Sequence, residues 1–491
     1  MWLLSDTLLD RVAGFITRTR MVNEGDRLGV AVSGGADSVV LLHLLNQLSG
    51  HLHFEPVVVH INHRLRGEAS DCDEQFVRTL ADGLALPVFV ESAAPPAGDN
   101  LEQAARDQRR ALFARLLDQG IVTRVALGHT MSDQAETVLF RMIRGTGLTG
   151  LAGMPPVSSN GLIRPLLEIT RDEVRNYAAH QGLTWREDIS NEQREFRRNF
   201  IRLELLPQLR ATFHDRVEHG LANLASLSQV EEEYWGAEAA RLLSSLASSR
   251  LGLAGDQELL LDSPALMSLP LAARRRVIRE AIRRVKGDLK KVDSIHIDAI
   301  LRLCEVSEGH DRVQVPGIDA LRSFDRLRLT LLGTVAVQRH YQVDVACNQH
   351  VSLPFQAGEI QLSGADSAPV IRAKFKEERA LQFADFDARK LEQAGVSGLK
   401  IRNWEPGDEY QCVGHSHPEK VKTLFQENRI YLWERRHWPV LEAEGQILWV
   451  RGFGPSADVA ASDGSLEIVR LSYYKEPLRG VSAEFGFPRA E

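Results

Sequence analysis

The sequence predicts an α/β protein in three parts: an N-terminal parallel sheet flanked by helices, a helical middle domain, and a small mixed or β-rich C-terminal domain. Strand-like and helix-like segments alternate over the first two hundred residues, and helical periodicity dominates after about residue 215. Short strands between Gly, Pro and Asp residues take over from about residue 312. One hydrophobic core rarely exceeds about 250–300 residues, so a chain of 491 residues should hold several domains. We place them at 1–215, 216–345 and 346–475, with a tail at 476–491.

The elements of the N-terminal part follow one another regularly. Its β-branched runs predict strands at 27–32, 55–62, 87–92 and 124–129. Periodic apolar residues predict helices near 37–48, 70–84, 101–120 and 131–144. Ligands of such sheets bind outside the carboxyl ends of the strands, so functional residues should follow the first, second and fourth strands.

The later elements are shorter. Helical patterns cover 221–243, the basic segment at 274–291, and 294–306. Turn residues then separate predicted strands near 348–355, 358–364, 368–375 and 445–454.

Composition limits the classes of protein to consider. The chain is 44% hydrophobic and 25% charged, as globular proteins are, and no segment reaches the roughly 20 apolar residues of a membrane span. Asp6, Asp10 and Arg11 interrupt the first twenty residues, which therefore do not read as a secretory signal. The four cysteines lie far apart without a C-x-x-C pair, which disfavours a disulfide framework or zinc ribbon and favours a reducing cytoplasm.

One segment departs from the acidic average. The net charge is −7, but residues 274–291 hold nine basic residues against Glu280 and Asp288. A basic stripe of this kind is a candidate contact for a polyphosphate such as RNA. A solvated helix face is the alternative.

The segment SGGADS, residues 33–38, lies between the first strand and the first helix of the sheet. Glycines there let backbone N–H groups approach an anion, and the two serine hydroxyls can donate to phosphate oxygens. Asp37 suits such a site if Mg²⁺ lies between it and the phosphates. The loop lacks the lysine of a Walker-type loop. A hydrolase nucleophile at Ser33 and a plain glycine turn are the alternatives.

SGGADS resembles the loop of the PP-loop ATP pyrophosphatases, and further segments resemble the tRNA(Ile)-lysidine synthetases in order along the chain. In the N-terminal part these are HINHRLRGEAS (60–70), GHTMSDQAETVLFRMIRGTGLTGL (128–151), RPLL (164–167), WREDISN (185–191) and RRNFIR (197–202). In the C-terminal part they are RNWEPGDEYQ (402–411) and KVKTLFQENRIYLWERRHWPVL (420–441).

This resemblance implies a two-step reaction. ATP adenylates the C2 carbonyl oxygen of the wobble cytidine of an isoleucine tRNA with a CAU anticodon, and pyrophosphate leaves. The amine of free L-lysine then attacks C2 and displaces AMP, giving lysidine. The implied cofactors are ATP and Mg²⁺, the implied partners are that tRNA and lysine, no membrane is involved, and the implied location is cytoplasmic. A homodimer is left open.

The resemblance also assigns roles to residues. Asp133 and Glu136, three apart on one helix, would bind lysine; as first-turn acids they would otherwise only complement the helix dipole. The catalytic set is Asp37, His129 and Arg202, and the residue that accepts the amine's proton is left open. The ATP-binding set is Ser33, Gly34, Gly35, Ala36, Asp37, Ser38, His60 and Arg66, with Asp37 holding Mg²⁺ through the phosphates. A zinc site at His60 and His63 is disfavoured.

The expected tRNA-binding set combines basic residues from all three domains: Arg198, Arg274, Arg275, Arg276, Lys420, Lys422 and Arg435. Trp433 and Trp438 lie among the last of these, either to stack on a base or as core residues. For Arg198 the alternative is pairing with nearby carboxylates. A metal cluster at Cys412, His415 and His417 is disfavoured. A tRNA-thiolating enzyme and a catalytically idle RNA-binding protein are the rival functions.

Overall fold

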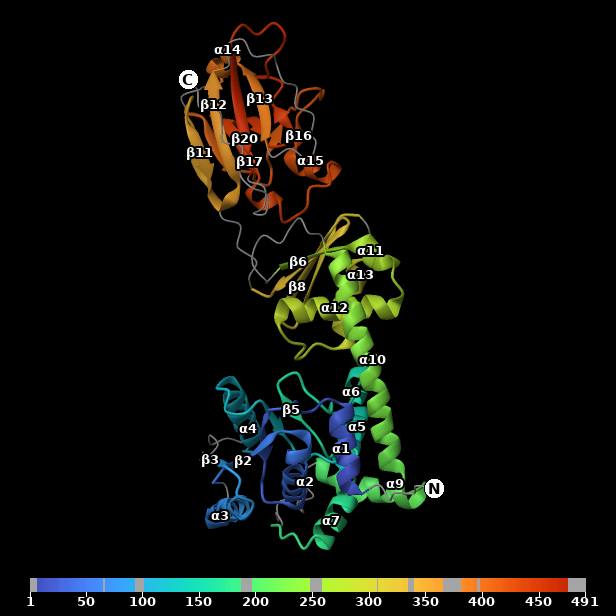
Figure 1. Cartoon of the computed structure of the whole chain (residues 1–491). Coiled ribbons are helices and arrows are strands. Elements are labelled where there is room, and N and C mark those ends of the chain that lie inside the picture. The colour runs from blue at the N-terminus through green and yellow to red at the C-terminus, as the bar shows by residue number, and fades with distance from the viewer. Residues whose placement is uncertain are drawn as a thin grey trace. The chain divides into compact units, whose positions relative to one another are not determined.

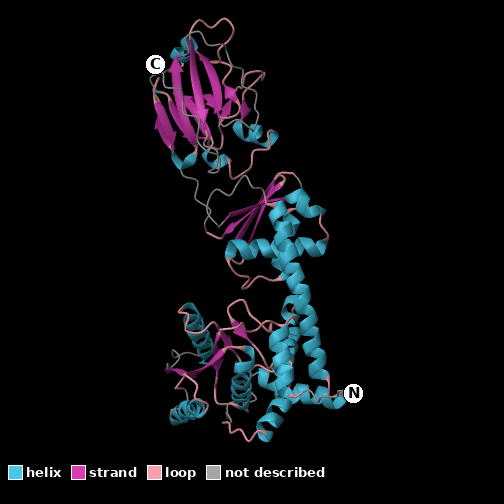
Figure 2. Ribbon diagram, viewed as in Figure 1, coloured by secondary structure: helices cyan, strands magenta, loops and turns pink. Residues whose placement is uncertain are grey.

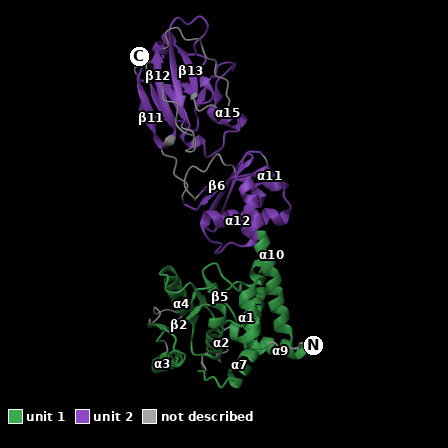
Figure 3. Ribbon diagram, in the orientation of Figure 1, with its two compact units in different colours: residues 1–235 green, residues 236–491 purple. Residues whose placement is uncertain are grey.

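The computed structural model forms two compact units, residues 1–235 and 236–491 (Figure 3). The described residues are 7–64, 67–92, 101–186, 197–247, 258–306, 308–333, 340–364, 381–394 and 398–475. Arg66, the predicted strand at 368–375 and the tail at 476–491 lie outside the described residues.

Unit 1 is built on the predicted parallel sheet (Figures 1 and 2). Its strand order is β3-β2-β1-β4-β5, and all four neighbouring pairs are parallel. The strands are β1 (Arg27–Ala31), β2 (Glu55–Asn62), β3 (Val88–Ser92), β4 (Arg124–Ala126) and β5 (Leu162–Ile163). The chain runs outward from β1 to β3 and then crosses to β4, so the topological switch point lies between β1 and β4. A ligand of this fold class is expected at that point, beyond the carboxyl ends of the two strands.

Helices cover both faces of this sheet. On one face, Val40 and Leu44 of α2 pack with Val12 of α1 against Val30 and Val58. On the other, Leu112, Phe113 and Leu116 of α4 pack against residues of β2 and β4. The described helices of unit 1 are α1 (Leu8–Arg18), α2 (Ala36–Leu52), α3 (Glu68–Gly83), α4 (Leu101–Asp118), α5 (Met131–Ile143), α6 (Leu148–Leu151), α7 (Arg171–His180), α8 (Arg197–Phe200), the π-helix η2 (Ile201–Leu205), α9 (Leu206–Thr212) and the start of α10 (Val217–Leu246).

The first part of unit 2 contains the expected helices and adds an antiparallel sheet to them. The sheet order is β6-β9-β8-β7, and α12 buries the apolar stripe of Val277, Ala281 and Val285. The elements are β6 (Glu258–Asp262), α11 (Ser263–Ser268), α12 (Leu271–Lys286), α13 (Ser294–Leu303), β7 (His310–Val315), β8 (Ile318–Ser323) and β9 (Arg326–Leu331).

The second part of unit 2 is β-rich, as predicted. Two sheets, β10-β14-β17-β18-β19 and β11-β12-β20-β13, share a core that includes Ile360, Phe386, Leu441 and Tyr473. The strands are β10 (Gln342–Asp344), β11 (His350–Leu353), β12 (Gly358–Gly364), β13 (Leu381–Asp387), β14 (Lys400–Asn403), β15 (Glu409–Tyr410), β16 (Glu419–Lys420), β17 (Pro439–Ala443), β18 (Gln446–Val450), β19 (Gly454–Pro455) and β20 (Ile468–Tyr474). The helices are α14 (Ala388–Gln393) and α15 (Val421–Glu427), with 3₁₀ turns η4 (Pro354–Gln356) and η6 (Arg435–His437). Among the described residues, no helix is both long and apolar enough to cross a bilayer.

Candidate active site

The loop after β1 has the geometry expected of a close backbone approach. Gly34 has φ +93°, in the left-handed region, and Gly35 is the N-cap of α2 without a side-chain cap. The Ser38 hydroxyl donates to the Gly35 carbonyl oxygen at 2.9 Å and accepts from the Ser33 amide at 3.2 Å. The amide of Arg186 donates to the Gly34 carbonyl oxygen at 3.0 Å and fastens the loop from outside. The uncapped start of α2 can therefore receive an anion.

Gly128, after β4, lets a second loop approach this one. A Cβ at Gly128 would lie 3.2 Å from the backbone carbonyl of Asp37 and from the Ser38 amide nitrogen. Both neighbours are main-chain atoms of the first turn of α2, so neither can move without shifting the helix start. The close contact sets the spacing between the glycine loop and His129.

We expect Gly128→Ala to lower the free energy of unfolding by about 1–3 kcal/mol, because it overpacks main chain against main chain. Affinity for a non-hydrolysable ATP analogue should fall with it, as measured by titration calorimetry. Gly50→Ala is the matched control, since Gly50 lies within α2 with nothing within 4 Å of where a methyl group would be, and it should gain stability. Unchanged nucleotide affinity in Gly128→Ala would contradict the spacing role.

Asp37 presents an unpaired oxygen to this edge of the sheet. Its Oδ1 atom is buried and has no hydrogen-bond partner among the described residues, and its Oδ2 lies 3.8 Å from the Arg171 Nε. Burial raises the pKa of Asp37 to about 6, with Asp133 adding to the rise and Arg171 opposing it. The Asp37 side chain as a whole is 30% exposed, and a partly buried carboxylate with one unpaired oxygen fits a divalent cation, so the donor expected to hold Mg²⁺ has the right chemistry.

The two carboxylates of α5 converge on one arginine. Thr130 caps the helix and receives Asp133 in a capping box, which fixes that side chain at the helix start. Asp133 Oδ1 accepts from Arg171 Nη2 at 2.8 Å, and Glu136 Oε1 accepts from Arg171 Nη1 at 3.1 Å. Glu136, 3% exposed, also accepts from Arg198 Nε at 3.0 Å. Arg171 therefore links the carboxylate of the glycine loop to both carboxylates of α5.

Arg171 belongs to this site but was not predicted from the sequence. It is the first residue of α7 and lies within the capping box that Thr170 and Glu173 form. The sequence pattern of this box could have shown that a helix starts here and fixes the position of Arg171. Burial opposes ionisation of Asp133, but Arg171 and His129 outweigh it and lower the pKa of Asp133 below its ordinary value. Arg202 lies close enough to act electrostatically on Asp37, Asp133 and Glu136, and burial lowers its pKa.

Two histidines reach the same edge of the sheet in the neutral form. His60 Nδ1 lies 2.8 Å from the Val32 carbonyl oxygen, which can only accept, so Nδ1 carries the proton and the buried Nε2 is an acceptor with no partner among the described residues. Burial lowers the pKa of His60. For His129, burial lowers the pKa to about 4, and its Nδ1 is likewise buried without a described partner. In the described part of the chain, no group of three potential ligands could hold a metal by itself.

The structure thus brings together Asp37, the residues His129, Asp133 and Glu136 of a second segment, and Arg202 of a third. The basic residues expected to bind tRNA differ in their surroundings. Lys420 and Lys422 are exposed, with Lys420 3.8 Å from Glu409. Arg275 pairs with Asp298, and Arg274 donates to the Leu269 carbonyl oxygen.

Arg435 corrects an expectation. It is 3% exposed, and its guanidinium donates twice to the Ile430 carbonyl oxygen, at 2.9 and 2.7 Å. Its side chain packs against Phe425 and Phe324. It therefore holds the segment after α15 in place and is not on the surface for tRNA. Trp438 is 3% exposed, which fits a core residue and not a base-stacking one.

The parallel sheet, its switch point and the glycine loop at the first crossover define an α/β nucleotide-binding class of protein. A family model described as a PP-loop domain matches residues 8–209. Models described as a TilS substrate binding domain and a TilS substrate C-terminal domain match 261–328 and 399–472.

Three relatives show to which family within this class the chain belongs. A tRNA(Ile)-lysidine synthase of Solibacter usitatus is 40% identical over 459 residues, covering 92% of this chain and 99% of its own. Those of Symbiobacterium thermophilum and Geobacter sulfurreducens are 33% and 35% identical, covering 96% and 95% of this chain and 98% and 97% of their own. The chain belongs to the tRNA(Ile)-lysidine synthase family.

Proposed function

We propose that this protein uses ATP to join L-lysine to C2 of the wobble cytidine of an isoleucine tRNA with a CAU anticodon. The observation that carries the proposal is the convergence of Asp37, Asp133 and Glu136 on Arg171 at the switch point. Asp37, whose unpaired oxygen suits a divalent cation, thus lies beside Asp133 and Glu136, whose two carboxylates suit an ammonium group. A nucleotide subsite and an amine subsite thus adjoin.

In the first step, the loop formed by residues 33–38 and the N-terminus of α2 would hold the phosphates of ATP. The Nε2 acceptor of His60 suits an adenine amino group or a ribose hydroxyl. Asp37 would be the protein ligand of Mg²⁺, and the ion would supply charge neutralisation for the pyrophosphate that leaves. Arg202 lies near enough to Asp37 to act on it electrostatically, and it would face the same phosphates.

In the second step, Asp133 and Glu136 would hold an ammonium group of lysine, while Arg198 and Arg171 orient the pair. The lysine amine forms the bond to C2, the C2–O bond to AMP breaks, and a proton leaves the amine. His129 is a weak base because burial lowers its pKa to about 4. We therefore assign His129 to orienting the reacting groups, not to accepting the proton.

The tRNA would contact basic residues outside the site, of which Arg275, Lys420 and Lys422 are exposed and Arg274 and Arg276 are partly buried. We keep Arg274, Arg275, Arg276, Lys420 and Lys422 in this set, leave out the buried Arg435, and assign Arg198 to Glu136. The domain limits at 215, 345 and 475 also stay a proposal.

One assay tests the function. Purified protein is incubated with ATP, labelled lysine and a transcript with a CAU anticodon. Label in the RNA together with lysine-dependent AMP release supports the proposal. AMP release without label in the RNA points to another adenylating enzyme, such as a tRNA-thiolating one. RNA binding without ATP turnover points to an idle RNA-binding protein, and either of these results contradicts the proposal.

The proposed amine subsite can be tested separately from the proposed nucleotide subsite. We expect Asp133→Asn to raise the KM for lysine about tenfold or more, since it removes one of two charges facing the ammonium group, while ATP-dependent pyrophosphate release changes less. Asp10→Asn is the matched control, because Asp10 has the same capping-box position in α1, away from the site. Steady-state kinetics with lysine as the varied substrate measures the effect. Equal KM values for the two variants would rule out the assigned subsite.

A further inference from the structure

The first turns of α5 and α7, which carry the carboxylates and the arginine of the proposed amine subsite, are joined by two hydrogen bonds. The Met131 amide at the start of α5 donates to the Ile169 carbonyl oxygen at 2.8 Å. The Arg171 amide at the start of α7 donates to the Ser132 hydroxyl oxygen at 3.1 Å. Amides in the first turn of a helix have no acceptor within the helix, so each bond satisfies a donor that its helix leaves open. The two helix starts are therefore held at a fixed spacing.

A buried carboxylate of α10 fixes the orientation of the hydroxyl between these helices. Glu218 is 3% exposed, and its Oε2 accepts from the Ser132 hydroxyl at 2.9 Å. A serine hydroxyl has a single proton, and a carboxylate can only accept. The Ser132 proton therefore points to Glu218, and the lone pairs of the same oxygen are left for the Arg171 amide.

The carboxylate of Glu218 is itself held by an arginine of α9. Arg210 pairs with the Oε1 atom of Glu218, while Ser132 donates to Oε2, so each oxygen has a donor of its own. Pairing with a cation and hydrogen bonding offset the cost of burying a carboxylate. Glu218 is thus a fixed acceptor at the point where α5, α9 and α10 meet.

α10 also holds the residue on the other side of Asp133. Gln134 is 2% exposed and exchanges two hydrogen bonds with the backbone of Met154, at 2.9 and 2.8 Å. Gln229 of α10 donates to the same Met154 carbonyl oxygen at 2.9 Å. Ser132 and Gln134 are the sequence neighbours of Asp133, and α10 therefore fixes the helix turn on both sides of this carboxylate.

We propose that Glu218 is a positioning residue for the amine subsite. Through the Ser132 hydroxyl it sets the spacing between the first turns of α5 and α7. That spacing in turn sets how Asp133 faces Arg171, with 2.8 Å between Oδ1 and Nη2. Displacements of about 1 Å at such contacts can cost up to about 10²-fold in rate. The consequence for lysine rests on the proposed function, whereas the hydrogen bonds that carry the positioning do not.

Glu218→Gln tests the positioning role directly. The amide has one oxygen for two donors, so either Ser132 or Arg210 loses its acceptor. With ATP and transcript saturating, we expect the KM for lysine to rise about three- to tenfold, because the two helix starts lose their fixed spacing. The KM for ATP should change less, since residues 33–38 take no part in these bonds. Steady-state kinetics with each substrate varied in turn measures the two values.

Ser132→Ala keeps the test decisive if Glu218→Gln does not fold. It removes the hydroxyl, so the Arg171 amide loses its acceptor and the KM for lysine should rise by a similar factor. Because both substitutions act through one hydrogen bond, the double variant should be no worse than Ser132→Ala alone. Effects that multiply in the double variant would show that Glu218 acts by another route and would overturn the proposal.

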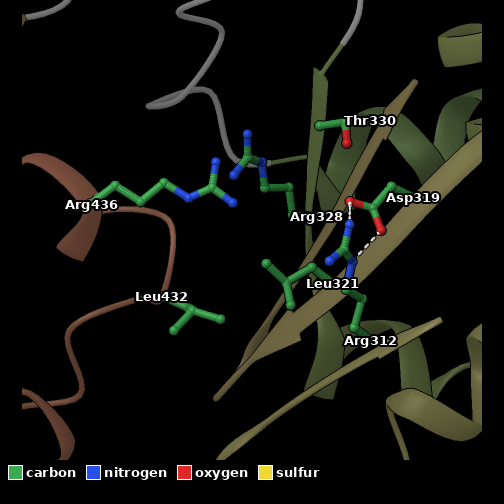
Figure 4. A pocket seen from close by; sticks show the side chains of 7 residues that line it. All are labelled: Arg312, Asp319, Leu321, Arg328, Thr330, Leu432 and Arg436. Carbon is green, nitrogen blue, oxygen red and sulfur yellow. Dashed lines mark hydrogen bonds and ion pairs between the residues drawn. The ribbon is translucent and has the colours of Figure 1, made fainter. Parts of the chain in front are cut away.

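Asp319→Asn in unit 2 is the matched control. Asp319 is also 3% exposed, and it accepts two hydrogen bonds from Arg312, at 2.6 and 3.0 Å (Figure 4). The control therefore removes the charge of an equally buried, arginine-paired carboxylate, and it should lower the free energy of unfolding but leave the KM for lysine at the wild-type value. If Glu218→Gln behaves in the same way, its role is only to stabilise the fold, and the proposal is overturned.

Amide hydrogen exchange separates this proposal from the proposed function, because it needs no substrate. The Arg171 amide should exchange faster in Glu218→Gln and in Ser132→Ala than in the wild type and in Asp319→Asn. Faster exchange in a protein whose wild type incorporates no lysine would contradict the proposed function but support Glu218 as the residue that positions the two helix starts. Lysine incorporation by the wild type, with exchange and lysine KM unchanged in the folded variants, would overturn the positioning role alone.

Discussion

Asp37→Asn is expected to lower ATP-dependent pyrophosphate release by about 10²-fold or more, while the fold is kept. The substitution preserves shape but removes the one charge that the unpaired Oδ1 presents to the phosphate loop. A bound Mg²⁺ would lose its protein carboxylate, and charge stabilisation at a departing phosphate commonly contributes several kcal/mol. Pyrophosphate release with saturating ATP, transcript and lysine measures the loss.

The free energy of unfolding of Asp37→Asn should not fall together with its activity. The folded-state pKa of Asp37 is raised above 3.8, to about 6, so the free energy of unfolding falls as the pH rises from 3.8 to about 6, and the full cost of ionising this carboxylate is present above that range. At pH 7 the neutral Asn removes this cost, and the free energy of unfolding should stay level or rise. Asp172→Asn is the control, since the Asp172 side chain is 71% exposed and should affect neither quantity. Wild-type pyrophosphate release by Asp37→Asn would refute the assigned role.

Sequence alone could predict those parts of the site that are local in the chain. Residues 33–38 are consecutive, and Asp133 and Glu136 are neighbours because a helix brings residues three apart together. The alternation of strands and helices then placed both segments at one edge of the sheet.

The missed features depend on contacts distant in sequence. Arg171 meets Asp133 and Glu136 from 38 and 35 residues further along the chain. The close packing at Gly128 depends on where α2 begins. Composition also cannot distinguish a surface arginine from Arg435, whose buried guanidinium donates hydrogen bonds to a backbone carbonyl oxygen. Sequence patterns predict which face of an element is polar, but not which partner a long side chain finds.

Arg171→Met is expected to lower the free energy of unfolding at pH 7 by about 3–5 kcal/mol, the range for removing one partner of a buried ion pair. The Arg171 side chain is 14% exposed and touches Asp133 and Glu136 directly, so both carboxylates would lose their shared partner and keep only the pairing with Arg198 and the weaker effect of Arg202. Arg18→Met is the control, because its pair with Glu168 is about half exposed and should be worth about 1 kcal/mol or less.

The pH dependence separates lost charge pairing from lost packing in Arg171→Met. A carboxyl whose folded pKa is lowered, as that of Asp133 is, adds stability above its unfolded pKa of 3.8 and loses it as the pH falls through the folded pKa. Without Arg171 the pKa of Asp133 should rise, so its protonation as the pH falls relieves the repulsion. The difference between wild type and variant should therefore be largest at pH 7 and shrink toward pH 4, measured by denaturant unfolding at each pH. A difference that stays constant with pH would show that Arg171 acts by packing and not as the cation shared by the two subsites.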